Sequence, residues 1–568
     1  MKNLCKLFLF FLLHQQGLMA QNNALWIPDT LAGPNFNLAI QDTFSQIKPG
    51  QQTITVGINN RFLGPTLIFN QGDTVRFNVK NRMNEPTTLH WHGIHLPAVM
   101  DGGPHQLIPV GTTWKPYWKV ENKAATYWYH PHLHGKTAEH TLKGAAGLII
   151  VRDEEERNLN LPGKYGIDDF PLVIQSLQFG SDNQIIPNGF RDSTILINGT
   201  LNPFLQVPAQ KVRLRLLNAS NARNFYVGFS QSVPFYLIAN DGSLLGKPLA
   251  VTRIKLAPGE RAEVIVDFSG LQSGTVLMKS FGSEIPGGTQ GGPLPDLPVG
   301  TIPMKSPLNG ADFELLELRI GMANSNPSGP LPDSLAAQST LTEDQSDEQR
   351  TIRFSPKVPG AYSGIYYVND SIFKIRRIDL SIPVNNIEVW TIHNQTPIAH
   401  PFHLHGFEFV VLDRYGAPVG PEEKGLKDVV LVYPNEQLRI ISQFSNYADT
   451  TMPYMFHCHL FTHEDDGMMA QFVVKPRITG IKEKGISDSG FSLFPNPAQD
   501  KLYVSFSESD SKAYYIKIIN STGKVLYMLP RPELKNGLAI SSLPKGIYFL
   551  ELTDEKTRTK STKRFVKI

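Results

Sequence analysis

One short stretch, residues 455–468, restricts what this chain can fold into more than any other part of it. It reads MFHCHLFTHEDDGM and so concentrates histidine, cysteine and methionine in one place. If residues 456–460 form a strand, successive side chains point to opposite faces, so His457 and His459 face one way and Cys458 the other. The stretch therefore predicts that one strand supplies ligands to two different metal sites.

The first of these sites is built on the cysteine. His463 and Met468 follow Cys458 closely, and a turn around Gly467 can bring both side chains back to the thiolate. A Cys-His site with a weak axial Met becomes the trigonal blue-copper type, which passes single electrons, once one more imidazole is added. We expect His400 to supply that imidazole.

The second site is predicted from paired histidines. Three further pairs share the i, i+2 spacing of His457 and His459, and on a strand this spacing puts both imidazoles on one face, so that the pairs can converge. The four pairs give eight candidate ligands: His90, His92, His130, His132, His403, His405, His457 and His459.

These motifs, in this order, resemble those of the multicopper oxidases, the family of laccases, bilirubin oxidases and bacterial copper-efflux oxidases. The bacterial three-domain branch is the most similar, through LHWHG at 89–93, HPHLHGKT at 130–137 and the stretch 457–468. The resemblance implies four coppers per chain. It assigns His400, Cys458, His463 and Met468 to type 1 copper, His90 and His403 to type 2, and His92, His130, His132, His405, His457 and His459 to the type 3 pair.

No ligand position of the family is missing, which argues against a copper-free relative. His134 is an extra histidine in the second motif, and we expect it beside the ligands and not among them. Four more histidines fit no motif and are interpreted as ordinary surface or core residues: His95, His105, His140 and His393.

The N-terminus predicts export. A basic start is followed by an apolar run, residues 7–13, and by a small-residue cleavage site at Leu18-Met19-Ala20, so residues 1–20 are expected to be a signal peptide. The run is too short for a membrane anchor. Cleavage removes Cys5 and leaves Cys458 without a disulfide partner, which metal ligation explains.

The 568 residues are too many for one ordinary core, and the 46 Gly and 42 Pro favour turn-rich β-structure. Runs at 52–56, 74–79, 147–151, 212–217 and 262–268 predict strands. With the resemblance, we predict an all-β chain of three consecutive cupredoxin-like Greek-key β-sandwiches plus a small C-terminal β-sandwich. The three sandwiches are predicted at 21–160, 161–345 and 346–476, and a linker at 477–489 leads to the C-terminal domain at 490–568. A Pro/Gly-rich connection at 284–349, with one strand at 314–320, joins the second sandwich to the third.

The histidine pairs divide between the first and third sandwiches, so the second copper cluster is predicted at their interface. No histidine lies between His140 and His393. The middle sandwich is therefore expected to carry no copper chemistry and to hold the outer two at the correct angle. The acidic run 153–156 is interpreted as a solvated boundary.

The C-terminal region resembles the sorting domain of type IX secretion cargo, through FPNP at 494–497, LPKGIY at 543–548 and the closing residues 563–568. This implies the type IX machinery as a partner and a protein that is secreted or held on the outer cell surface after crossing the periplasm. A small adhesion or carbohydrate-binding sandwich is the alternative. The net charge of +3 predicts no polyanionic partner, and hence no nucleic acid; we expect a monomer.

The resemblance implies one-electron oxidation of a small reductant and four-electron reduction of O2 to water. His463 is expected to receive electrons, which Cys458 passes to His457 and His459. Asp101 and Glu464 match proton donors of the copper-efflux branch; from the residues alone they are a turn Asp and a surface Glu.

Copper-efflux oxidases carry a methionine-rich insert, whereas no Met occurs here from 323 to 451. We therefore expect laccase-like oxidation of phenols or aromatic amines, with oxidation of Cu(I) or another metal ion as the alternative. Bilirubin-like pigments stay open. A hypothesis of another class is a non-catalytic cupredoxin, either an electron carrier or a copper buffer. A carrier requires one copper, so the eight further histidines argue against it.

Overall fold

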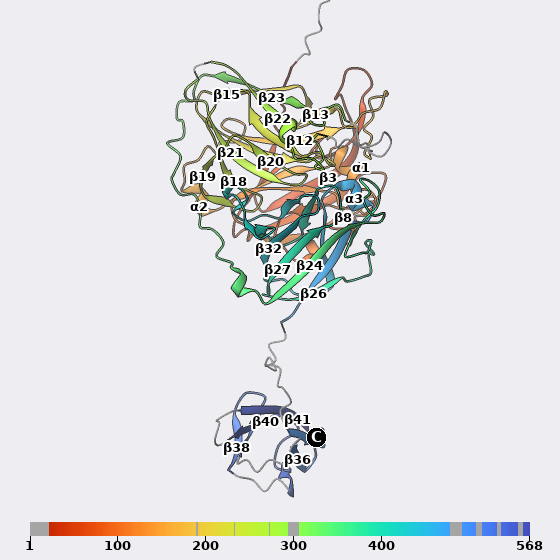
Figure 1. Ribbon diagram of the computed structural model, residues 1–568, viewed down its shortest axis with the longest axis vertical. Helices are drawn as coiled ribbons and strands as arrows, with labels where there is room; N and C mark the ends of the chain where they lie inside the picture. Colours follow the sequence, from red (N-terminus) through yellow and green to blue (C-terminus); the bar gives the residue numbers. More distant parts are fainter. Residues whose placement is uncertain are drawn as a thin grey trace, which may run out of the picture. The chain divides into compact units, whose positions relative to one another are not determined.

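The computed structural model describes nine ranges of the chain and shows two compact units, one ending at Arg477 and one beginning at Ile478 (Figure 1). The predicted signal peptide and nearly all of the predicted linker lie outside the described residues. No described helix is long and apolar enough to cross a membrane. The described ranges are 22–188, 191–231, 233–271, 273–293, 306–477, 491–506, 514–530, 536–554 and 560–568.

The larger unit consists of three pairs of sheets, so the all-β prediction is confirmed. In the first pair, alternation builds the core: Val75, Phe77 and Val79 are buried between more exposed neighbours. Its two sheets have the orders β2-β5-β11-β10-β7 and β4-β3-β6-β8, with β9 on β6. Their strands are β2 (Thr30–Ala32), β5 (Thr66–Asn70), β11 (Gly147–Arg152), β10 (Ala125–His130), β7 (His90–His92), β4 (Thr53–Ile58), β3 (Asn35–Ser45), β6 (Thr74–Asn81), β8 (Thr113–Trp114) and β9 (Tyr117–Lys119).

The second pair of sheets encloses the largest apolar cluster of the chain's described part. The sheets have the orders β1-β15-β23-β22-β17-β20 and β14-β13-β12-β16-β21-β18-β19. Their strands are β1 (Asn23–Ala24), β15 (Pro203–Pro208), β23 (Asp312–Gly321), β22 (Gly274–Phe281), β17 (Phe225–Phe229), β20 (Ile254–Leu256), β14 (Thr200–Leu201), β13 (Thr194–Ile197), β12 (Asp169–Leu177), β16 (Lys211–Asn218), β21 (Arg261–Asp267), β18 (Phe235–Ala239) and β19 (Leu244–Ala250).

The third pair carries most of the metal motifs, and its long strands β24, β27 and β32 run side by side in Figure 1. The sheets have the orders β25-β24-β27-β32-β29-β30 and β26-β34-β33-β28-β31. Their strands are β25 (Tyr366–Val368), β24 (Glu348–Pro356), β27 (Ile387–Asn394), β32 (Gln437–Gln443), β29 (Phe409–Arg414), β30 (Ala417–Pro418), β26 (Leu380–Pro383), β34 (Met469–Lys475), β33 (Asp449–Cys458), β28 (His400–Leu404) and β31 (Val429–Val432).

The smaller unit has its own apolar core, which includes Leu502, Ile516, Leu550 and Phe565. A three-stranded and a four-stranded sheet form it, with the orders β35-β36-β39 and β38-β37-β40-β41. The strands are β35 (Phe491–Phe494), β36 (Lys501–Phe506), β39 (Leu538–Ala539), β38 (Val525–Pro530), β37 (Tyr514–Asn520), β40 (Gly546–Asp554) and β41 (Lys560–Lys567).

The acidic run 153–156 is only partly a solvated boundary, because Glu154 and Glu155 are exposed and the two residues that flank them are not. Asp153 and Glu156 are both buried. Asp153 caps the short helix α2 (Glu154–Arg157) by accepting a hydrogen bond from the Glu156 backbone N–H at 2.7 Å. The Glu156 carboxylate in turn accepts from the Arg213 guanidinium at 2.7 Å, so these acidic groups join the first and second pairs of sheets.

Three of the histidine pairs straddle strand ends, which corrects the expectation that each pair lies on one strand. Strand β10 ends at His130, so His132 lies beyond it. Strand β33 ends at Cys458, so His459 lies just beyond it, and β28 ends at Leu404, before His405. Strand register still brings the motifs together. His403 pairs with His457 across β28 and β33, and His90 pairs with His130 across β7 and β10.

Glu408 connects all three pairs of sheets. Its carboxylate accepts hydrogen bonds from the Tyr127 hydroxyl and the Asn122 amide, both at 3.2 Å, and lies where a side chain on Gly242 would collide with it. Burial raises the pKa of Glu408 to about 8, with a further contribution from the charge of Asp428. The carboxyl is therefore protonated at neutral pH in the folded chain.

We expect Glu408→Gln to flatten the pH dependence of stability between pH 5 and 8. The folded-state pKa lies above the unfolded value, so the unfolded state releases this proton first and the wild-type protein loses stability as pH rises through that window. A glutamine mimics the protonated carboxyl and removes this contribution. Thermal melts across the pH range measure the difference, and equal slopes for both proteins would contradict the assignment.

Candidate metal centre

The four residues predicted for the type 1 site lie together in the core of the third pair of sheets. His400 begins β28, Cys458 ends β33 and His463 lies in the short helix α3 (Phe461–Asp465), not in the turn that the sequence suggested. The Cys458 sulfur lies 3.3 Å from His400 Nδ1 and 3.7 Å from His463 Nδ1. Met468 is fully buried in the same cluster as Cys458 and accepts a hydrogen bond from the Cys458 N–H through its backbone carbonyl, at 3.2 Å.

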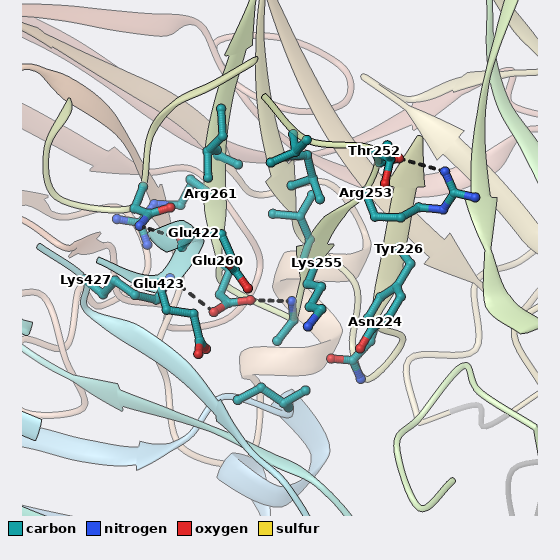
Figure 2. A pocket seen from close by; sticks show the side chains of 18 of the residues that line it. Asn224, Tyr226, Thr252, Arg253, Lys255, Glu260, Arg261, Glu422, Glu423 and Lys427 are labelled. Carbon is teal, nitrogen blue, oxygen red and sulfur yellow. Dashed lines mark hydrogen bonds and ion pairs between the residues drawn. The ribbon is translucent and has the colours of Figure 1, made fainter. Parts of the chain in front are cut away.

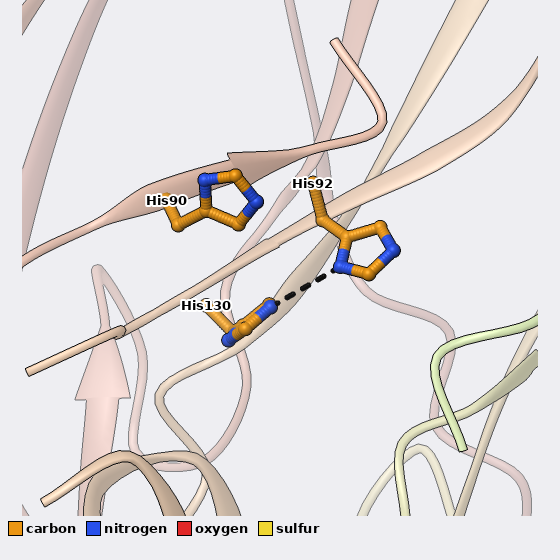
Figure 3. Close-up of side chains that lie close together, drawn as sticks. All are labelled: His90, His92 and His130. Atoms are coloured by element: carbon orange, nitrogen blue, oxygen red, sulfur yellow. Dashed lines mark hydrogen bonds between the residues drawn. The ribbon is translucent and has the colours of Figure 1, made fainter. Parts of the chain in front are cut away.

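The eight paired histidines are fully buried and converge where the first and third pairs of sheets meet. In one group, His457 Nε2 lies 3.1 Å from His132 Nε2 and 3.0 Å from His405 Nε2. In a second, His92 Nδ1 lies 3.4 Å from His130 Nε2, and Figure 3 shows these two rings facing each other with His90 beside them. The His459 ring lies 4.8 Å from that of His92.

His90 and His403 complete the cluster. Each turns Nδ1 toward a backbone carbonyl, that of Asp101 at 2.9 Å and that of Asp428 at 2.8 Å, respectively. Each leaves Nε2 buried with no hydrogen-bond partner. Both nitrogens of His459 are also buried without a partner. Buried polar atoms rarely lack partners, so these orphaned nitrogens fit a bound metal ion.

The electrostatics favour metal binding as well. Burial lowers the pKa of seven of the eight paired histidines, and for His457 the pKa falls to about 3. The charges of neighbouring imidazoles lower the pKa of several of these histidines further. Burial likewise lowers the pKa of His463 to about 3 and raises the pKa of the Cys458 thiol. The imidazoles whose pKa is lowered are neutral, which is the state that binds metals, whereas the cysteine needs a cation to become a thiolate. The donor set fits copper: soft sulfur with imidazole in one site, imidazoles alone in the other.

Asp101 and Glu464 are both buried: Asp101 does lie at the end of the single helical turn Ala98–Met100, whereas Glu464 is not a surface residue. Asp101 is 1% exposed and Glu464 is fully buried. The Asp101 carboxylate lies 2.8 Å from His405 Nδ1, and the Glu464 carboxylate lies 3.2 Å from His132 Nδ1 and 3.6 Å from His457 Nδ1. Both carboxylates therefore touch the far side of predicted copper ligands, where they can orient the rings.

The sequence analysis missed two residues of the centre, Asp428 and Arg261. Asp428 Oδ1 lies 3.0 Å from His92 Nε2. Arg261 donates two hydrogen bonds to the Asp428 carboxylate, one of them at 2.6 Å, and all three side chains are fully buried. No local signal could have found this pair, since its members lie in different pairs of sheets and neither belongs to a histidine motif.

The middle pair of sheets is thus part of the centre, which corrects the expectation that it only spaces the other two. Besides Arg261, it supplies Gly259, whose backbone has a φ of +87°. A Cβ at Gly259 would lie 2.9 Å from His459 Nδ1, so only glycine allows the backbone to pack this closely on the imidazole.

The other histidines stay outside the metal groups. His134 is exposed, and its ring packs edge-on against Phe373 at 5.3 Å. His140 is buried within hydrogen-bond distance of Thr87 and Glu85. His95, His105 and His393 are partly buried, and none of the five joins a metal-binding group within the described residues.

Comparison with known families agrees with this site. Models of the multicopper oxidase family match residues 39–156, 173–282 and 330–477, and a model of the secretion system C-terminal sorting domain matches residues 492–568. The fold and the buried Cys/His centres define a copper protein of the cupredoxin type. The chain belongs to the multicopper oxidase family and carries a type IX sorting domain at its C-terminus.

Several relatives are similar over most of their length. A multicopper oxidase, mco, of Staphylococcus aureus is 31% identical over 78% of this chain and 88% of its own. The cell division protein FtsP of Xenorhabdus nematophila is 34% identical over 75% of this chain and 86% of its own. Among solved structures, the laccase-like multicopper oxidase CueO of Ochrobactrum sp. has a TM-score of 0.71 and 32% identity, covering 79% of this chain and 100% of its own.

We expect Arg261→Leu to destabilise the protein by about 3–5 kcal/mol, because it leaves the Asp428 carboxylate buried without its cation. Arg253→Leu is the control, since Arg253 pairs with Glu284 at the surface and exposed pairs contribute about 0–1 kcal/mol. Denaturant unfolding of both variants measures the difference. Equal losses would show that the buried pair has no special role.

Proposed function

We propose that this protein is a laccase-like multicopper oxidase, which oxidises small phenols or aromatic amines one electron at a time and reduces O2 to water. The observation that carries the proposal is the arrangement around Cys458. Its sulfur belongs to one buried ligand group and its neighbour His457 to another, while the ring of its other neighbour, His459, lies 4.8 Å from that of His92 in the same histidine cluster. One backbone segment thus links a one-electron centre to a multi-ligand centre.

Within this proposal, four copper ions are held by the ligands assigned from the sequence and supply the redox chemistry. His463 is the most exposed residue of its group, at 7%, so it suits electron entry from a reductant. The backbone from Cys458 to its two neighbours spans the two centres. Asp101 and Glu464 place carboxylate oxygens next to the histidine cluster, where they can pass on protons, and reduction of O2 to two waters consumes four protons.

The substrate class is supported by the absence of methionine at positions 323–451 and by one neighbour. The Ochrobactrum enzyme is described as having oxidase activity towards lignin model compounds and lignosulfonate. Metal-ion oxidation is the second candidate, since a neighbour from Campylobacter jejuni at 26% identity is described as a metallo-oxidase. A non-catalytic role is the third, because the FtsP relatives are named for cell division.

One experiment separates these candidates. Copper content per chain is measured together with steady-state O2 uptake, using a panel of phenols and aromatic amines and, separately, Cu(I). About four coppers with phenol-dependent uptake supports the proposal, and uptake with Cu(I) alone supports a metal-ion oxidase. A single copper without O2 uptake would indicate a carrier, and no copper a non-enzymatic relative.

We further propose that the protein is secreted or displayed on the cell surface by type IX secretion. The support is the sorting-domain match at residues 492–568, which falls in the smaller compact unit. The copper ligand set lies entirely in the larger unit, so the two tasks use different parts of the chain. The domain boundaries given above remain predictions.

Cys458→Ser is expected to abolish the blue absorption and nearly all oxidase activity while the protein stays folded. The absorption requires a thiolate ligand, and the serine hydroxyl is close in size to the thiol. Visible absorption, O2 uptake and a thermal melt check the three parts. A blue and active serine variant would overturn the type 1 assignment.

Asp101→Asn and Glu464→Gln are expected to slow reoxidation by O2 without slowing reduction by the reductant. Each amide keeps the shape of the carboxylate but cannot deliver a proton at neutral pH, and neither residue contacts His463 through a hydrogen bond in the described structure. Stopped-flow mixing measures the two half-reactions separately, and copper analysis checks that ligand positions are intact. If both halves slow equally, the carboxylates act by orienting the ligands.

A further inference from the structure

A pocket of about 470 Å³ opens between the second and third pairs of sheets (Figure 2). Strands β17 and β20 supply one wall, and the segment from Arg414 to Tyr433 supplies the other. None of its lining residues is a predicted copper ligand. The turn from Ala257 to Arg261 separates it from His459, so it is a site distinct from the copper cluster.

The pocket suits a small molecule with an apolar body. Its volume lies in the range of about 300–1,000 Å³ typical of ligand sites, and a cavity of about 150 Å³ already holds one benzene ring. Ile254, Leu256 and Leu431 form apolar wall, and the hydroxyls of Tyr226 and Tyr433 lie 3.4 Å apart at its edge. The space therefore accommodates one or two rings.

One cation in the lining, Lys255, has no ion pair in the described part of the chain, although its ammonium lies 5.7 Å from the centroid of the Tyr226 ring and its charge helps to lower the pKa of Glu423. The other basic residues are engaged: Arg414 donates to Glu423, Arg253 to Glu284, and Lys427 pairs with Asp241. Lys255 is exposed and has no ion pair among the described residues. In the view of Figure 2, its side chain lies between Glu260 on one side and Asn224 and Tyr226 on the other.

One buried acceptor in the lining lacks a donor. Asn224 is 2% exposed, and its amide nitrogen donates to the Gln290 carbonyl at 3.0 Å. Its side-chain oxygen accepts no hydrogen bond. Since buried polar atoms are nearly always paired, this oxygen indicates a ligand that brings a hydroxyl or amine donor.

We propose that this pocket binds a small hydroxyaromatic carboxylate. The carboxylate pairs with the Lys255 ammonium, the ring packs on Ile254, Leu256 and Leu431, and the hydroxyl donates to Asn224 Oδ1. This binding needs neither copper nor turnover, so it extends beyond the proposed oxidase function and stands without it.

The test uses the copper-loaded full-length protein under nitrogen, titrated calorimetrically with 4-hydroxybenzoate. We expect one saturable site, at least about tenfold weaker binding of benzoate and of phenol, and at least about tenfold weaker binding in Lys255→Gln. Lys247→Gln is the matched control, because Lys247 is an exposed lysine of the same pair of sheets outside the pocket.

The outcomes decide the proposal and separate it from the oxidase assignment. The proposal is overturned if no saturable binding is seen, or if binding weakens equally in the two lysine variants. If phenol binds as tightly as 4-hydroxybenzoate, the pocket does not recognise the carboxylate, and that part of the proposal is wrong. Binding must also survive in Cys458→Ser. Its loss there would place the ligand at the copper site and overturn the separate pocket, whereas an inactive enzyme that still binds would refute only the oxidase function.

Discussion

The buried carboxylate of Asp428 is the contact on which the larger unit depends most. It belongs to the third pair of sheets, lies 3.0 Å from His92 of the first and accepts hydrogen bonds from Arg261 of the second. A carboxylate removed from water costs several kcal/mol unless it is paired and fully hydrogen-bonded. The three pairs of sheets must therefore meet at this point for the charge to be satisfied, and their meeting places the histidines.

The histidine cluster constrains the structure in another way, because its groups must stay neutral whereas Asp428 is charged. Its imidazoles are buried among one another, so protonation of any one would put a charge in a site with little water and several neutral neighbours. Burial thus holds the rings neutral and ready for metal. The unpartnered nitrogens of His90, His403 and His459 are destabilising in the chain alone, and a bound metal ion would remove this penalty.

The residues predicted as ligands do come together in the structure, because each motif is local and strand register does the rest; that they bind copper stays a prediction. Sequence reasoning predicted strand ends poorly: His459 and His405 lie just beyond their strands, and His463 lies in a helix of five residues, too short to show a helical pattern. It also took the acidic run 153–156 for a solvated surface. Burial of Asp153 and Glu156 depends on Arg213 and on a helix cap, and no pattern of hydrophobicity records such partners.

The same limit explains why the middle pair of sheets looked like a spacer. The middle pair of sheets contains no histidine, but a metal centre needs walls and charge balance as well as ligands. Gly259 forms the wall, since its positive φ and missing Cβ let the backbone lie against His459, and Arg261 balances Asp428. A mere spacer would tolerate a side chain at Gly259 and a neutral residue at Arg261. These contacts require glycine and a cation, so the middle pair of sheets forms part of the candidate metal centre together with the two that supply its predicted ligands.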